Sequence, residues 1–130
     1  FENYATINFS TFEKPQQRMD FIVKQIALTA VVQTNVEKLN VTNAAELKGE
    51  LALLNKKSIN NIVIDMSKTK YCDSSGLSAI LLANRLCKDT NGKFVLCGLQ
   101  TNVQKLIEIA QLDRVLSIVK DEKSALELIA

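Results

Sequence analysis

The feature that most constrains this chain is a short apolar run, Asn61–Met66, whose centre reads Ile62-Val63-Ile64 without a polar residue. Such runs are typical of a strand covered on both faces, as strands of parallel sheets are. We therefore expect a central strand that lies parallel to a neighbour. A loop (67–73), a helix over Ser74–Asp89 and a strand over Phe94–Cys97 follow it. This order predicts one βαβ unit.

Two β-branched runs precede this unit. The segments Phe21–Ile26 and Leu28–Gln33 are short and closely joined, which favours a hairpin. Val36 and Leu39 are expected to extend the second strand as far as a polar turn.

The remaining elements are mainly helical. Leucines spaced by four and three residues predict a helix over Ala44–Lys57, with three candidate N-caps: Asn40, Thr42 and Asn43. A helix over Val103–Ala110, a strand over Val115–Val119 and a short amphipathic helix over Glu122–Ile129 close the chain. The order ββαβαβαα or ββαβαβαβα predicts an α/β fold, a mixed β-sheet of four to five strands with about four helices packed on it.

Residues 1–19 stand apart from this pattern. They have no clear period and contain the only proline of the chain, Pro15. We interpret them as a leader or an extra strand outside a single domain at residues 20–130, because 130 residues suffice for one domain. Met19 can be a native start, in which case the preceding residues are translated upstream sequence or an artificial extension.

Composition excludes several classes of function. The net charge of +2 gives no strong field for nucleic acid or an anionic membrane. The chain has no histidine, the imidazole source of Ser-His-Asp, Cys-His and most catalytic zinc sites. The cysteines Cys72, Cys87 and Cys97 form no CxxC pair, which fits free thiols in a reducing compartment. We expect a cytoplasmic protein with no cofactor, no metal, no direct nucleic acid partner and no membrane insertion.

The helix over Ser74–Asp89 is expected to have two different faces. At about 100° per residue, one face gathers the residues expected in the core: Ala79, Ile80, Ala83, Leu86 and Cys87. The opposite face carries polar residues: Ser74, Ser78, Arg85 and Lys88. Leu77 and Leu81 lie with this polar set, although a purely solvated face needs no leucine. An apolar patch with a polar rim is typical of a protein-docking site.

The tetrapeptide Asp73-Ser74-Ser75-Gly76 also has a purely structural interpretation. Aspartate and serine are common helix N-caps, and glycine permits tight packing. The leader could likewise cover Leu77 and Leu81. These residues alone leave both interpretations open.

The run Asp73-Ser74-Ser75-Gly76-Leu77, preceded by Ile62-Val63-Ile64-Asp65 and followed by Ala79-Ile80-Leu81-Leu82, resembles the signature of STAS-domain anti-sigma-factor antagonists. The resemblance covers about residues 20–130 and implies a STAS-like fold. It also implies that Ser74 is phosphorylated by a partner that is both an anti-sigma factor and a serine kinase. The unphosphorylated protein then binds this partner and releases the sigma factor, and a serine phosphatase resets the switch.

The resemblance further implies a partner-binding surface around Ser74. It consists of Asp73, Ser74, Ser75, Gly76, Leu77, Ser78, Leu81, Arg85, Leu39 and Asn40. Gly76 is expected to let the kinase backbone approach Ser74 closely. One departure concerns the segment Glu37-Lys38-Leu39-Asn40, where many members of the family have Gly-Glu-Leu-Asp. Asn40 in place of the acid is expected to alter contacts made by this segment.

Three alternatives remain open at this stage. The first keeps the fold and makes the chain a STAS regulatory subunit of a transporter ATPase complex. The second is a serine hydrolase or a nucleotide-binding protein with Lys68 or Lys70 as a base near Ser74, although the chain has no GxSxG or GxxxxGK[ST] motif. The third concerns Cys72 alone, which is either a redox-sensitive thiol or a small buried hydrophobe.

Overall fold

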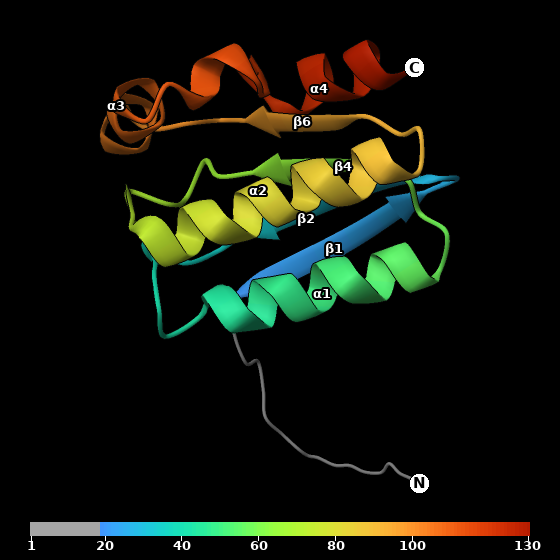
Figure 1. The fold of residues 1–130 in the computed structure, drawn as a ribbon, viewed down its shortest axis with the longest axis horizontal. Helices are drawn as coiled ribbons and strands as arrows, with labels where there is room; N and C mark the ends of the chain where they lie inside the picture. Colours follow the sequence, from blue (N-terminus) through green and yellow to red (C-terminus); the bar gives the residue numbers. More distant parts are fainter. Residues whose placement is uncertain (1–18) are drawn as a thin grey trace, which may run out of the picture.

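The computed structural model describes residues 19–130, and in that range it contains a five-stranded mixed sheet (Figure 1). The strand order is β1-β2-β4-β6-β7, with bounds β1 Phe21–Ile26, β2 Thr29–Thr34, β4 Asn61–Asp65, β6 Phe94–Cys97 and β7 Ser117–Val119. β1 and β2 form an antiparallel hairpin, whereas β2, β4, β6 and β7 run parallel. The expected hairpin, the central position of β4 and the mixed α/β class are confirmed.

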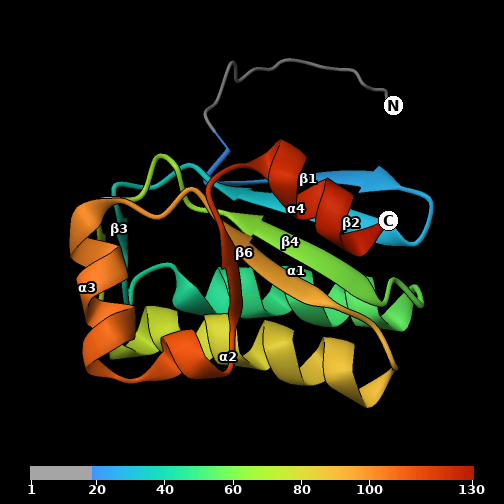
Figure 2. The same ribbon diagram turned by 90° about the horizontal axis from the view of Figure 1, so that it is seen from above.

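Four α-helices accompany the sheet within the described range. They are α1 Ala44–Lys56, α2 Ser74–Asp89, α3 Thr101–Ile109 and α4 Glu122–Ile129. Figure 2 shows α1 and α2 on one face of the sheet, α4 on the other and α3 at one end. All four were expected from the sequence, and α3 begins at Thr101 rather than at Val103.

The neighbouring positions of α1 and α2 follow from the strand order. Along the sheet the strands appear in the same order as along the chain, so successive crossovers move in the same direction. Because parallel crossovers are almost always right-handed, two that move the same way place their helices on the same face. The two helices consequently lie side by side and start at the same end of the sheet (Figure 1).

The apolar run in β4 is buried on both faces of the sheet, as its sequence predicts. Ile62 and Ile64 join the larger core beneath α1 and α2. Val63 belongs to a smaller core on the opposite face, where it is in one cluster with Ala125 of α4. Each such side chain contributes about 1.5–3 kcal/mol through its removal from water.

Leu39 does not extend the second strand, contrary to expectation, because β2 already ends at Thr34. Lys38–Leu39 instead form β3, which pairs in parallel with β5 (Tyr71–Cys72) in a separate two-stranded sheet of the described region. The expected loop at 67–73 therefore contains a short strand. A strand of two residues is too short to show a hydrophobic period, so neither β3 nor β5 can be recognised from the sequence.

The strand expected at Val115–Val119 is shorter, since β7 comprises Ser117–Val119. Leu112–Arg114 form a short 3₁₀ helix, η1. The two residues after η1 donate their backbone N–H groups to the carbonyl oxygen of Leu112 at 3.1 and 2.9 Å. These bonds extend the turn to Val115 and Leu116, so neither residue pairs with the sheet.

Asn43 occupies the N-cap position of α1, but its side chain does not cap the helix. The Asn43 Oδ1 accepts a hydrogen bond from the backbone N–H of Asn40 at 3.0 Å, and its Nδ2 donates to the carbonyl oxygen of Lys38 at 2.9 Å. The Asn40 Oδ1 accepts hydrogen bonds from the backbone N–H and the hydroxyl of Thr42 at 3.0 and 2.6 Å. The three candidate caps therefore fix the turn between β3 and α1.

The leader expected at residues 1–19 lies, apart from Met19, outside the described residues and stays a prediction. The same is true of its suggested contact with Leu77 and Leu81. From residue 19 onward, no helix combines the length and the apolar character needed to cross a bilayer.

Candidate functional site

Asp73 has a structural task at the start of α2. Its carboxylate accepts a hydrogen bond from the backbone N–H of Gly76 at 3.0 Å, which caps the helix. Its own backbone N–H donates to the carbonyl oxygen of Leu39 at 3.2 Å. Asp73 thus fixes where α2 begins and ties this end to β3, which determines the position of the next residue, Ser74.

Gly76 faces the interior of the protein. A Cβ atom built on it would lie 2.5 Å from the Sγ of Cys72 and 2.7 Å from the carbonyl oxygen of Leu39. Real Cβ atoms do not approach other atoms this closely. From the sequence we expected this glycine to let a kinase backbone approach, and the structure corrects that explanation: the space is taken by β3 and β5 of the same chain. Leu39 is also fully buried, so its side chain supports the site from inside and contacts no partner.

The two-stranded sheet under α2 is tied to the main sheet by a buried polar contact. The hydroxyls of Thr34, at the end of β2, and Thr69, before β5, lie 2.7 Å apart, and both residues are buried. The Thr34 hydroxyl also lies 3.3 Å from the carbonyl oxygen of Asp65. Buried hydroxyls are costly unless hydrogen-bonded, so this pair holds the approach to β5 in one position relative to β2 and β4.

The two faces expected for α2 are largely present. Four of the five expected core residues are buried: Ala79, Ile80, Ala83 and Cys87. Leu86 is partly exposed, although it packs against the core. The polar set is exposed throughout: Ser74, Ser78, Arg85 and Lys88.

Leu77 and Leu81 differ in how far their side chains are exposed, although the helical period predicted the same face for both. Leu81 is 38% exposed and belongs to the surface. Leu77 is half-buried and packs against the main core, so its expected position away from the core is wrong in part. Ser75 is also half-buried.

A groove lies between α1 and α2, and Ser74 is at one end of it. Its volume is about 660 Å³, and it is lined by Lys48, Ser74, Leu77, Ser78, Leu81, Leu82 and Arg85. Five of these residues were expected in the partner-binding surface. Lys48 was not predicted from the sequence, because that residue is on α1 and only the same-face packing of the two helices brings it beside α2.

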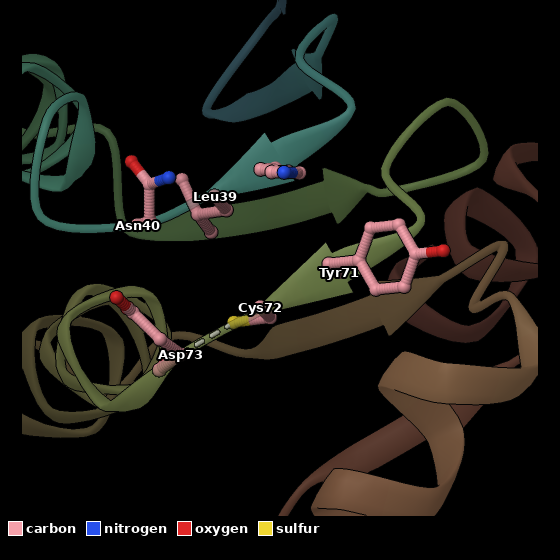
Figure 3. A pocket seen from close by; sticks show the side chains of 6 residues that line it. Leu39, Asn40, Tyr71, Cys72 and Asp73 are labelled. Atoms are coloured by element: carbon pink, nitrogen blue, oxygen red, sulfur yellow. Dashed lines mark hydrogen bonds between the residues drawn. The ribbon is translucent and has the colours of Figure 1, made fainter.

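A second hollow, of about 450 Å³, lies at the start of α2 and is lined by a different set of residues (Figure 3). Its lining comes from the short strands and the residues after them: Lys38, Leu39, Asn40, Tyr71, Cys72 and Asp73. It brings together the predicted residues Asn40 and Asp73, and it adds Lys38 and the 46% exposed Tyr71, which the sequence did not predict. Pairing of β3 with β5 places these residues together, and no sequence signal showed that pairing.

Cys72 is set up as an unreactive thiol. Burial, and to a smaller extent the negative charge of Asp73, raises its pKa from 9.0 to about 12. Because the thiolate is the reactive form, this shift keeps Cys72 protonated and slow to oxidise at neutral pH. The environment favours the interpretation of Cys72 as a small packing residue over that of a redox-sensitive thiol.

Ser74 is an exposed hydroxyl in a groove with apolar walls. Neither Lys68 nor Lys70 lines this groove, and Lys70 instead faces Glu37 with 4.0 Å between Nζ and Oε2. Across residues 19–130, no cluster of three His, Cys, Asp or Glu side chains is arranged to hold a metal ion. The arrangement suits a hydroxyl that contacts a partner or accepts a modification.

Similarity to known proteins agrees with this geometry. The family model of the STAS domain matches residues 7–125, a range that begins within the expected leader. BtrV of Bordetella bronchiseptica, named as a candidate anti-sigma factor antagonist, is 33% identical over 72 residues, which are 55% of this chain and 62% of BtrV. The anti-sigma F factor antagonist of Paenibacillus polymyxa is 26% identical over 73 residues, 56% of this chain and 62% of that protein. The chain thus spans about 62% of the length of the curated relatives it matches.

The fold also has a close counterpart among solved structures. The crystal structure of a candidate anti-sigma factor antagonist from Thermotoga maritima superposes with a TM-score of 0.78 at 24% identity. The superposition covers 84% of this chain and 93% of the Thermotoga chain, so the two share the mixed sheet and its helices. The family match spans the segment around Ser74 and nearly all of the described fold. The chain belongs to the STAS domain family.

Proposed function

We propose that this protein is an anti-sigma-factor antagonist whose binding is switched by phosphorylation of Ser74. In its unphosphorylated form it binds an anti-sigma factor that is also a serine kinase, and the sigma factor is released. The observation that carries the proposal is the position of Ser74, exposed at the first residue of α2 and at one end of a groove with leucine walls. The names of the two relatives described above support the same role.

The predicted site is proposed to consist of supporting and contacting residues. Asp73, Gly76 and the buried Leu39 fix the start of α2. The residues proposed to contact the partner through the groove are Ser74, Leu77, Ser78, Leu81 and Arg85. Asn40 is proposed to contact it from the second hollow, and the half-buried Ser75 to contribute its exposed part.

A phosphate on Ser74 acts on binding rather than on folding. The phosphate adds about −1.5 to −2 charges at the positive end of α2, where an anion gains about 0.3–1 kcal/mol. Repulsion from the neighbouring Asp73 opposes this gain, so the fold tolerates the modification. Burying the dianion in an interface fitted to a hydroxyl and two leucines costs several kcal/mol, and about 1.4 kcal/mol is already tenfold in affinity.

We also propose that the protein acts in the cytoplasm and that a serine phosphatase removes the phosphate and restores the Ser74 hydroxyl.

The proposed function is tested with the serine-kinase anti-sigma factors of the organism from which the protein comes. Each is purified and incubated separately with the protein and ATP. Mass spectrometry is expected to find one phosphate, on Ser74. Ser74→Ala should remain unmodified and bind the kinase permanently, because a lost hydroxyl changes binding by about 0.5–1.5 kcal/mol at most.

Ser78→Ala is the matched control, since Ser78 is an exposed hydroxyl one turn further along the same groove. This variant should be phosphorylated like the wild type. Phosphorylation of Ser74→Ala at the wild-type level would refute the assignment of Ser74. Stable binding to a transporter ATPase, with no phosphorylation by any of the kinases, would refute the switch and support the regulatory-subunit alternative.

A further inference from the structure

The groove between α1 and α2 combines apolar walls with an unbalanced charge. Leu77, Leu81 and Leu82 supply its apolar surface. Its two charged lining residues are Lys48 and Arg85, and no aspartate or glutamate is among them. The carboxylate of Asp73 lines the second hollow instead, although Asp73 directly precedes Ser74.

The two cations in the groove are available to a ligand. Among the described residues the side-chain ion pairs are Lys24 with Glu122 at 3.0 Å and Lys70 with Glu37 at 4.0 Å, and neither involves Lys48 or Arg85. The groove therefore carries two cationic side chains, and no acidic side chain of the described fold forms an ion pair with either of them. The net charge of the whole protein is only +2. The two cations therefore make the groove a local site of attraction for acidic ligands.

The cations are spread along the groove. Arg85 is eleven residues after Ser74 on the same helix, a rise of about 16 Å. Lys48 is in the second turn of α1, which starts at the same end of the sheet as α2. One cation is thus near the Ser74 end and the other is about three helical turns away, so a ligand that meets both must be extended along the helices.

We infer that the groove selects an acidic amphipathic segment of the anti-sigma factor, whose apolar side chains contact Leu77 and Leu81 and whose carboxylates pair with Lys48 and Arg85. The inference rests on the proposed function and adds the chemistry that recognises the partner. Desolvated ion pairs flanked by apolar contact fix the register of such a segment, and the charge accelerates its association.

The same charge gives the switch a second component. A phosphate on Ser74 introduces about −1.5 to −2 charges at the end of the groove near Lys48 and weakens the attraction for carboxylates there. Phosphorylation then repels the acidic segment as well as obstructing it. Binding of the unphosphorylated protein should weaken strongly as the ionic strength rises, because at 0.1 M salt the interaction between charges is screened over about 10 Å.

The test measures the affinity of the purified serine-kinase anti-sigma factor for the full chain at low and high salt. Lys48→Glu and Arg85→Glu each reverse one groove charge and should weaken binding at least tenfold at low salt, with a smaller loss at high salt. Lys123→Glu is the matched control: it makes the same charge change at an exposed position of α4, on the opposite face of the sheet, and should bind like the wild type. Thermal melts establish that all three variants are folded, and Lys48→Gln and Arg85→Gln should give intermediate affinities.

The outcomes separate the inference from the proposed function. If the wild type binds and both groove variants behave like Lys123→Glu, the acidic-segment inference is wrong and the anti-sigma-factor role stands. If all three charge reversals weaken binding equally, the effect is one of net charge and the groove is not the selective element. A wild type that binds no serine-kinase anti-sigma factor overturns the proposed function, and the inference with it.

Discussion

Gly76 in α2 lies directly against Leu39 in β3, so closely that a Cβ atom on the glycine would come within 2.7 Å of the leucine's carbonyl oxygen. The backbone of Leu39 also accepts the Asp73 N–H at 3.2 Å and therefore cannot simply move aside. The start of α2, which carries Ser74, is held in position by this contact.

Replacing Gly76 by alanine should therefore destabilise the protein. Overpacking of this kind typically costs about 1–3 kcal/mol in the free energy of unfolding, measured by urea denaturation. Gly49→Ala is the matched control, because a Cβ at that exposed position of α1 meets nothing within 4 Å. There the exchange should stabilise the protein by about 0.5–1 kcal/mol. Equal effects of the two exchanges would contradict the described packing.

Leu81→Asp and Leu77→Asp should differ in their effect on the fold. Leu81 is 38% exposed, so its aspartate variant should melt within a few degrees of the wild type. Leu77 packs against the main core, and an aspartate there should lower the melting temperature clearly. Circular dichroism melts compare the two. A strongly destabilised Leu81→Asp protein would place this leucine in the core and remove it from the proposed docking surface.

Removing the cap of α2 should affect both stability and modification. Asp73→Ala is expected to cost about 1 kcal/mol in the free energy of unfolding, whereas Asp73→Ser should retain most of the stability because serine also caps helices. Fraying at the start of α2 should also slow phosphorylation of Ser74 by the kinase.

Asp121→Ala provides the comparison for this experiment. The Asp121 carboxylate caps α4 through the backbone N–H of Ser124 at 2.8 Å, on the opposite face of the sheet. Its loss should leave the rate of Ser74 phosphorylation unchanged. If both cap variants are phosphorylated at the same rate, the cap of α2 does not position Ser74 for the kinase.

The buried thiol of Cys97 should make stability depend on alkaline pH. Burial first, and the nearby carboxylates of Asp65, Glu122 and Asp121 second, raises its pKa from 9.0 to about 12. Above about pH 9 the thiol ionises in the unfolded chain but not in the folded one, so its contribution to stability is present below that pH and is lost as the pH rises toward 12.

A Cys97→Ala variant isolates this effect, because every other titrating group is shared with the wild type. The difference between the two free energies of unfolding, measured in urea, should decrease as the pH is raised from about 8 to about 11. A difference that stays constant over this range would show that the thiol of Cys97 does not titrate between the folded and unfolded states as described.

The elements that the sequence revealed are those long enough to repeat a pattern. The apolar centre of Asn61–Asp65 and the leucine spacing of α1 extend over enough residues to show a period, and both elements lie where expected. Strands β3 and β5 have two residues each and pair across more than thirty residues of chain. Their pairing depends on tertiary contacts such as that between Thr34 and Thr69, which no local pattern encodes.

The candidate site likewise contains residues that the sequence predicts and residues that it does not. The period of α2 alone predicted that Ser74, Leu81 and Arg85 share one exposed face, because a helix fixes these directions. Lys48 could not be added from the sequence, since its place depends on how α1 packs beside α2. The inward direction of Gly76 likewise becomes visible only when β3 is placed beneath it.

The order of the strands also bears on how the protein is made. In the main sheet the order β1-β2-β4-β6-β7 is the order of synthesis, so each strand leaving the ribosome adds to the free edge formed by the strand before it. No strand has to insert between two that are already paired. The β1–β2 hairpin is local and can form first, whereas later pairs such as Val95 with Ser117 close larger loops and form more slowly. Each newly synthesised strand can therefore pair with an existing edge of the sheet, which shortens the time for which unpaired apolar strands are open to aggregation.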